Sequence, residues 1–412
     1  MLQPVGVGHK SLADYTHLVG RPLIEEIRTL SDEMAGLRVL HLSATAFGGG
    51  VSEILYTLIP LMRDVGLEAE WQVIIGREEF YNATKLMHNA LQGNPLDLAP
   101  HEWKVYEEYN EINARELTGD WDVIIVHDPQ PLAVRQHCPE KSKNWIWRCH
   151  IDLSTPHPPT VERLVPLIAE YDLGSVYHLQ QYVPNSLNGD GPVHIVPPAI
   201  DPLSPKNMAL SPEDAAFVCD QFGVDVDRPL MCQVSRFDPW KDPHGVIDAY
   251  RIVKEEMPEV QLALVGSMAT DDPEGWEFFN STLEYAGGDP DIKILNNLNQ
   301  VGSIEVNAFQ SQAEVVIQKS TREGFGLTVS EALWKARPFI GGDVGGIPLQ
   351  VQDGTTGYLV SSPEDCADRS LRILREPELG KQLGRAGKEH VRQHFLTPRL
   401  LRDWLRIFSD LK

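Results

Sequence analysis

The stretch TREGFGLTVSEALWKA, residues 321–336, places two carboxylates, Glu323 and Glu331, on either side of a Gly-Phe-Gly at an expected helix start. Backbone amides in the first turn of a helix have no intrahelical acceptor and attract an anion such as phosphate. A carboxylate cannot hold a phosphate, but it accepts hydrogen bonds from sugar hydroxyls, commonly two at once. The pattern therefore suits a ligand with a sugar on each side of a diphosphate, as in a nucleotide sugar. A capping role stays open for Glu323 alone.

Two cations, Arg236 and Lys241, follow another expected strand in the stretch SRFDPWKD. The chain has a net charge of −23, so two cations at one strand end are a local exception. Their chemistry suits a clamp on a diphosphate, whose charge as a leaving group they would neutralise. Surface charge or a salt bridge is the alternative, and the position at a carboxyl strand end favours the clamp.

Glycines and a histidine mark strand ends in the first half of the chain. Gly48, Gly49 and Gly50 follow the expected strand RVLHLS and open a helix, which suits close backbone approach to a phosphate or sugar. No Gly-Lys-Ser/Thr follows and the spacing is not GxGxxG, so neither a P-loop nor a dinucleotide site is indicated. In RCHIDLS, His150 and Asp152 end a strand, and alternation would send both side chains to one side. They could bind sugar hydroxyls or move a proton, and a structural role for the histidine stays open.

The elements that position these residues alternate between short apolar runs and helical patterns. In VSEILYTLIPLMRDVG, residues 51–66, apolar residues fall on one helix face and Gly66 ends the helix. Such alternation predicts an α/β fold with a doubly wound parallel sheet in each half of the chain, and ligands bind beyond the carboxyl ends of such strands. Strands are expected at 38–43, 68–76, 121–128, 144–152, 229–237, 260–266, 291–297, 313–320 and 337–343.

Length and proline content predict two domains and a tail. The chain has 412 residues, too many for one ordinary core, and the proline-rich stretch 194–205 indicates a linker. We expect a Rossmann-like domain at 1–197, a second at 198–380, and terminal helices at 381–412 that cross back onto the first domain. Residues 1–37 stand outside the strand–helix series. A further glycine cluster at 341–348 is either a ligand loop or a structural turn.

Composition excludes several classes of protein. A net charge of −23 argues against non-specific binding to nucleic acid or to an anionic membrane. The five cysteines are scattered without a CxxC, so neither a disulfide framework nor a zinc site is indicated. No apolar run approaches the roughly 20 residues of a membrane span, and the N-terminus lacks a signal-peptide pattern. We expect a cytoplasmic protein with no membrane or nucleic-acid partner.

The ordered set of motifs resembles the retaining glycosyltransferases of family four, which have the GT-B fold. The motifs are the glycine-rich loop, the strand-end histidine, Ser-Arg-x4-Lys and Glu-x7-Glu, and they span both halves of the chain. The segments FGGGVSEIL, MHNALQG and IWRCHIDLS look like those of the trehalose glycosyltransferring synthases within that family. Such enzymes transfer glucose reversibly from a nucleoside diphosphate glucose to free glucose, which yields α,α-trehalose.

The resemblance implies roles for the matched residues. Arg236 and Lys241 would hold the donor diphosphate, Glu323 the donor glucose and Glu331 the ribose, while His150 would contact the donor sugar near the reacting carbon. Catalysis would rest on Arg236, Lys241, Glu323 and His150. The remaining donor-binding residues would be Gly49, Gly50, Gly324, Phe325, Gly326, Leu327 and Thr328, and the acceptor-binding residues Asp152, Lys85, His88, Asn89 and Gln92.

Three hypotheses follow. The first is the trehalose-forming glucosyltransferase, with ADP- or UDP-glucose as donor and no cofactor required; Mg²⁺ is compatible with this chemistry but is not predicted as a protein-bound ion. The second is a trehalose phosphorylase of the same fold, against which Glu331 argues because phosphate has no ribose; another family-four hexosyltransferase also stays open. The third is a binding protein without turnover. The family favours homodimers.

Overall fold

The computed structural model describes residues 2–187, 191–268 and 273–411. The chain divides into two compact units, of which the first comprises Met1–Ala199 and Thr397–Lys412 and the second Ile200–Leu396. No helix in these described ranges is long and apolar enough to cross a membrane.

The first unit is built on a seven-stranded sheet with the order β1-β3-β2-β4-β5-β6-β7. All neighbours pair in parallel except β1, which lies antiparallel to β3 at the edge. The central strands are apolar and buried on both faces, as parallel strands covered by helices must be. The strands are β1 Gln3–Pro4, β2 Arg38–Ser43, β3 Glu68–Val73, β4 Val123–His127, β5 Trp145–Arg148, β6 Ser175–Tyr177 and β7 Val193–Ile195.

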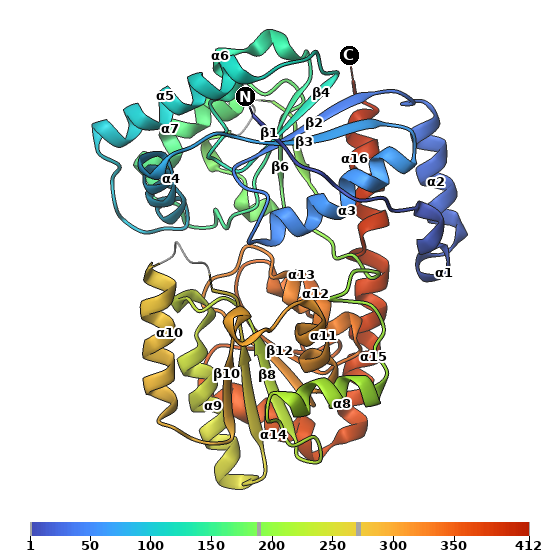
Figure 1. Ribbon diagram of the computed structural model, residues 1–412, viewed down its shortest axis with the longest axis vertical. Coiled ribbons are helices and arrows are strands. Elements are labelled where there is room, and N and C mark those ends of the chain that lie inside the picture. The colour runs from blue at the N-terminus through green and yellow to red at the C-terminus, as the bar shows by residue number, and fades with distance from the viewer. Residues whose placement is uncertain (1, 188–190, 269–272, 412) are drawn as a thin grey trace. The chain divides into compact units, whose positions relative to one another are not determined.

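Helices cover this sheet. In α3 the predicted apolar face, which includes Ile54, Leu58 and Met62, is buried, and the helix ends before Gly66, whose φ is 96°. The C-terminal helix α16 packs against α2 and α3 although it is far from both in sequence (Figure 1). The helices of the first unit are α1 Thr16–Val19, α2 Arg21–Asp32, α3 Gly50–Asp64, α4 Glu78–Leu91, α5 Pro100–Glu116, α6 Val134–His137, α7 Pro158–Ala169 and α16 Thr397–Phe408.

The second unit carries a six-stranded, fully parallel sheet with the order β10-β9-β8-β11-β12-β13. Its helices lie around this sheet, with α9 and α10 next to each other in Figure 1. The strands are β8 Leu230–Val234, β9 Gln261–Val265, β10 Ile292–Leu295, β11 Val315–Gln318, β12 Phe339–Gly342 and β13 Tyr358–Val360. The helices are α8 Pro212–Gln221, α9 Pro243–Glu256, α10 Pro273–Ala286, α11 Ser303–Gln312, α12 Leu327–Trp334, α13 Ile347–Gln350, α14 Pro363–Arg375 and α15 Pro377–His394.

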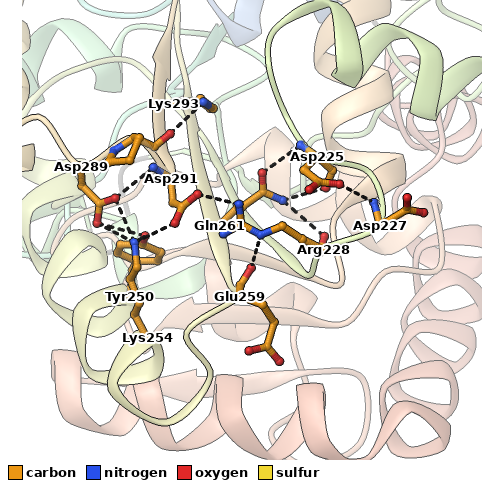
Figure 2. Close-up of polar contacts among 11 residues, drawn as sticks. Asp225, Asp227, Arg228, Tyr250, Lys254, Glu259, Gln261, Asp289, Asp291 and Lys293 are labelled. Carbon is orange, nitrogen blue, oxygen red and sulfur yellow. Dashed lines mark hydrogen bonds and ion pairs between the residues drawn. The ribbon is translucent and has the colours of Figure 1, made fainter.

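A polar cluster lies at the amino ends of β8, β9 and β10, and we call it the amino-end cluster (Figure 2). Lys254 on α9 contacts both Asp289 and Asp291, with Nζ···O distances of 2.9 and 3.0 Å. Arg228 reaches Asp291 at 2.8 Å, and Lys254 also donates to the Tyr250 hydroxyl at 2.7 Å. The hydrogen bond from Arg228 lowers the pKa of Asp291 to about 2. These bonds join the starts of two strands to the end of α9.

The predicted alternation of strands and helices is confirmed, with two differences. The stretch 194–205, expected as a linker, begins inside β7, which pairs with β6. The helix α15 packs against α12 and α14 of the second unit, and a Cβ on Gly384 would lie 2.0 Å from the Ala336 carbonyl oxygen. The second unit therefore runs to Leu396 rather than to 380, and α16 alone returns to the first unit.

Candidate active site

The Gly-Phe-Gly loop leads from β11 into α12 in the second unit. Gly326 precedes the helix in the left-handed conformation, with φ of 79°, which disfavours other residues. The helix begins at Leu327, and Glu331 lies within it, buried to 1% relative exposure. Glu323 lies before the loop and is also buried. The two carboxylates thus bracket a helix N-terminus, as the sequence predicted.

The second glycine cluster, residues 341–348, packs against this loop. A Cβ on Gly346 would lie 2.7 Å from both the Gly324 carbonyl oxygen and the Phe325 Cα atom, so the two backbones need glycine there. Gln350 donates to the Phe325 carbonyl at 2.5 Å and accepts a bond from Ser330 of the same length. The cluster at 341–348 therefore has a structural role in holding the Gly-Phe-Gly loop. Sequence analysis missed Gln350, because no local pattern marks it.

Lys241 and Glu323 form an ion pair at the carboxyl edge of the sheet. The Nζ···Oε2 distance is 2.6 Å, and the two side chains are 14% and 10% exposed. Gln233 in β8 donates to the Lys241 carbonyl at 2.7 Å, which fixes the loop that carries the lysine. Lys319, after β11, forms an ion pair with Asp242, the N-cap of α9. The structure thus brings together a cation and a carboxylate that are 82 residues apart in sequence.

Arg236 lies on the same strand-end loop but is far more exposed. Its guanidinium is 3.2 Å from Asp238, and its side chain is 65% exposed. Apart from this ion-pair contact, the Asp238 carboxylate oxygens are buried without a hydrogen-bond partner in the described residues. Arg236 is therefore a cation at the carboxyl edge whose side chain is largely exposed, and its guanidinium could form charge-assisted hydrogen bonds with a phosphate.

Glu331 lies among two lysines and has one unsatisfied oxygen. Its Oε1 is 3.6 Å from Lys206 Nζ, while its Oε2 is buried with no hydrogen-bond partner in the described residues. Lys335 donates to Asn207 at 3.1 Å and to the Glu331 carbonyl at 3.2 Å. Burial lowers the pKa of Lys335 to about 7. An unpartnered buried carboxylate oxygen is costly, so Glu331 is set to accept a bond from a ligand hydroxyl. Lys206 was missed from sequence, since it directly follows the expected linker 194–205 and belongs to no motif.

In the first unit the Gly48–Gly50 loop leads from β2 into α3. Gly48 has φ of 73°, and Gly49 caps the helix in an extended conformation. A Cβ on Gly48 or Gly49 would meet nothing within 4 Å, so neighbouring packing does not require these glycines. The loop is exposed, which leaves its backbone accessible to a ligand.

His150 and Asp152 lie beyond the strand that was expected to carry them. The strand β5 ends at Arg148, so strand alternation does not determine where these two side chains point, and their shared face stays a prediction. The Asp152 Oδ1 accepts the backbone N–H of Ser154 at 2.8 Å, which fixes the turn after His150. The His150 ring instead contacts His127, with an Nδ1···Nε2 distance of 2.9 Å from His127 to His150.

The other residues expected to bind the acceptor lie on α4. Lys85, His88, Asn89 and Gln92 follow the i, i+3, i+4, i+7 spacing and share one face of the helix and its C-cap. The backbone N–H of His157 donates to the Ala90 carbonyl at 2.9 Å, so the loop after Asp152 runs beside the end of α4. The structure thus places all five expected acceptor residues on two adjoining segments of the first unit, and their function stays a prediction.

Two family models match the chain. The model for the trehalose synthase N-terminal domain covers residues 41–184, and the model for glycosyl transferases group 1 covers 218–390. Among solved structures, the UDP-forming α,α-trehalose-phosphate synthase of Burkholderia xenovorans, crystallised with glucose-6-phosphate, has a TM-score of 0.71 at 15% identity and covers 90% of this chain and 99% of its own. The protein is therefore a glycosyltransferase with the GT-B fold of two Rossmann-like units, which confirms the predicted class.

Sequence similarity narrows the class further. The trehalose synthase of Rubrobacter xylanophilus is 56% identical over 416 residues, which cover 100% of this chain and 99% of the relative. The chain belongs to the trehalose synthase family. A trehalose phosphorylase of Pleurotus pulmonarius is more distant, at 26% identity, and the match covers 96% of this chain and 60% of that protein.

Proposed function

We propose that this glycosyltransferase joins glucose from a nucleoside diphosphate glucose to free glucose, reversibly and with retention, to form α,α-trehalose. The observation that carries the proposal is the buried Oε2 atom of Glu331, which lacks a hydrogen-bond partner in the described residues. A carboxylate oxygen with an open acceptor position suits a ribose hydroxyl. The identity to a trehalose synthase over the whole chain supports the same reaction.

The second unit binds the donor in this proposal. Arg236 and Lys241 hold the diphosphate and neutralise the charge that develops as it leaves, so no protein-bound metal ion is required. The amides at the start of α12, in the stretch 324–328, face the same phosphates. Glu323 accepts bonds from hydroxyls of the donor glucose, and its ion pair with Lys241 holds the carboxylate in place.

The first unit binds the acceptor and contacts the donor sugar. His150 lies near the reacting carbon, and the backbone of Gly49 and Gly50 approaches the donor. The acceptor glucose donates a hydrogen bond to the Asp152 carboxylate and forms hydrogen bonds with the polar face of α4, whose residues include Lys85 and Gln92. The leaving phosphate assists deprotonation of the incoming hydroxyl on the same face of the sugar, which accounts for retention.

The test of the proposal is a panel of nucleoside diphosphate glucoses, ADP-glucose and UDP-glucose included, incubated with glucose. We expect trehalose, with the α,α linkage established by NMR of the anomeric protons. Arg236→Ala should remove most of this activity while circular dichroism and the melting temperature stay close to those of the wild type. No trehalose from any donor, or near-normal turnover by Arg236→Ala, would refute the proposed site.

Trehalose phosphorolysis is the second candidate, because a phosphorylase aligns with 96% of this chain. It predicts that trehalose and inorganic phosphate give glucose 1-phosphate without nucleotide. The Glu331 environment disfavours it, since inorganic phosphate brings no ribose hydroxyl to the buried acceptor. Phosphate-dependent release of glucose 1-phosphate in the absence of nucleotide would favour this candidate over the first.

We further propose that the enzyme acts in the cytoplasm as a homodimer, without a nucleic-acid or membrane partner. The net charge of −23 and the five buried free cysteines support a reducing compartment and argue against binding to anionic polymers. Light scattering coupled to size exclusion tests the dimer, and a monomer mass would contradict it.

A further inference from the structure

Four histidines form a row across the carboxyl half of the first sheet. They come from four adjacent strands in the order β2, β4, β5 and β6. His41 lies within β2, His127 ends β4, His150 lies two residues beyond β5, and His178 follows β6 directly. The row is not a metal site, because the described residues contain no group of three or more potential ligands placed to hold an ion.

Three of these rings form a continuous hydrogen-bonded chain. His41 Nδ1 lies 3.0 Å from His127 Nε2, and His127 Nδ1 lies 2.9 Å from His150 Nε2. The ring planes differ by only 18° and 23°, so the lone pairs and N–H bonds, which lie in the ring planes, can meet. His41 and His127 are buried to 0% and 3% exposure, whereas His150 is half-buried. The hydrogen-bonded row of rings therefore runs from the buried His41 outward to His150.

The three rings are neutral in this environment. Burial lowers the pKa of His41 to about 3. Burial and the nearby Arg148 guanidinium hold the pKa of His127 and of His150 well below the usual range. A neutral imidazole has one N–H and one acceptor nitrogen. The middle ring, His127, therefore donates one of the two bonds and accepts the other, so the proton position on one ring determines the positions on the other two.

The surroundings of His41, the innermost ring, determine in which direction the two hydrogen bonds between the rings are donated. His41 Nε2 is buried with no hydrogen-bond partner in the described residues, and the Trp404 ring packs against this imidazole with the ring planes at 78°. If His150 donated inward, the chain would end in a buried N–H at His41 without an acceptor. If donation runs outward, only a lone pair is left unpaired, and unpaired buried N–H groups are the rarer defect in folded proteins. Outward donation places the proton of each ring on Nδ1.

We propose that His127, backed by His41, is a positioning residue that fixes the tautomer of His150, so that His150 presents its Nδ1–H as a hydrogen-bond donor to an oxygen of the bound sugar. The inference rests on the proposed contact between His150 and the donor sugar. It adds two buried residues that do not touch substrate, and it specifies which nitrogen of His150 carries the proton. The bond from His127 occupies Nε2 and leaves Nδ1 for the ligand.

Long-range ¹H–¹⁵N correlation spectra of histidine-labelled full-length protein test the tautomers directly. We expect Nδ1–H on both His127 and His150, assigned by the signals lost in single variants. In His127→Leu we expect averaged ring nitrogen shifts for His150, because no neighbour then selects a tautomer. A wild-type His150 protonated at Nε2, or an unchanged His150 tautomer in His127→Leu, would overturn the inference.

Kinetics of a matched pair give the second readout. His127→Leu removes both nitrogens, while His127→Asn keeps an amide donor near the position of Nδ1. We expect kcat/KM for the donor to fall about tenfold in His127→Leu, the effect of one misdirected hydrogen bond, and to recover to within about threefold in His127→Asn. Equal losses in the two variants would contradict a positioning role.

Two controls separate this inference from folding defects and from the proposed function. Val126→Ala removes packing from the same buried strand and should leave the His150 tautomer and kcat/KM unchanged at matched stability. The spectra report on the tautomer whether or not His150 acts in the reaction. Full activity in His150→Ala would therefore refute the contact with the donor sugar, while the tautomer measurement would stand on its own.

Discussion

The two ends of the second sheet carry charged side chains that differ in how completely they are paired. In the amino-end cluster, Arg228 and Lys254 each contact a carboxylate at 3.0 Å or less, and Asp291 accepts from both. At the carboxyl end, Arg236 is 65% exposed and contacts Asp238 only at 3.2 Å. Lys241 and Glu323 also pair at the carboxyl end, at 2.6 Å, but Arg236 and the Oε2 atom of Glu331 keep hydrogen-bonding capacity for a ligand. The comparison teaches that incomplete pairing of some charged groups, rather than the presence of charge, distinguishes the proposed binding end of the sheet.

The most damaging change at the carboxyl end should be Glu323→Gln. The amide would accept fewer hydroxyl bonds and would leave Lys241 without its partner at 2.6 Å. We expect kcat/KM to fall by about 10²- to 10³-fold, as for the loss of a group that stabilises developing charge. Steady-state assays with the preferred donor measure it, and the exposed Glu255 on α9 provides a matched control in Glu255→Gln. A loss below about threefold would remove Glu323 from the site.

A smaller effect is expected from Lys206→Met, which tests how Glu331 is held. The lysine is 3.6 Å from Glu331 Oε1, so its loss leaves a buried carboxylate less well compensated and less well oriented. We expect KM for the donor to rise about tenfold, the effect of one charge-assisted hydrogen bond, with kcat little changed. Lys206→Arg should retain most donor affinity. If KM for the acceptor rose instead, Glu331 would not be a donor contact.

The smallest effect on activity is expected at the amino end, in Asp291→Asn. Turnover should be unchanged, while the free energy of unfolding falls by about 1 kcal/mol because the ion pairs are partly exposed. The folded-state pKa of Asp291 is about 2, below the ordinary value of 3.8, so its contribution is present above about pH 4 and lost as pH falls toward 2.

Denaturant titrations of wild type and Asp291→Asn at several pH values measure this contribution. The difference in unfolding free energy should shrink as pH drops below about 4. A difference that grows toward acid, or a loss of turnover at neutral pH, would show that the two ends of the sheet are not separated in function as proposed.

Local patterns predicted much of the second unit. The strand–glycine–helix pattern at 313–336 placed Glu323 and Glu331 correctly around a helix N-terminus, because spacing within one helix is set by local geometry. The periodic apolar face of α3 likewise predicted that helix to within two residues at each end. Such features need no knowledge of neighbouring strands.

Other parts depend on which strands become neighbours. His41 and His127 lie within apolar runs and read as core residues, and only the strand order brings their rings within 3.0 Å of each other. Gln350 donates a hydrogen bond to the Phe325 carbonyl of the Gly-Phe-Gly loop, although the two residues are 25 positions apart in sequence. The short strand β1 could not be predicted, since two residues carry no alternation and the pairing with β3 defines it.

The two crossings of the chain between its units have a consequence for biosynthesis. The backbone N–H of Ile200, where the second unit begins, donates to the carbonyl oxygen of Phe395, near the end of that unit, at 2.8 Å. The second unit is one continuous stretch, but the first needs α16, whose Trp404 and Phe408 are buried. During translation, the first unit therefore cannot complete its fold until the whole second unit has been synthesised, because α16 is translated last. The order of synthesis and the order of completion of the two units are opposite.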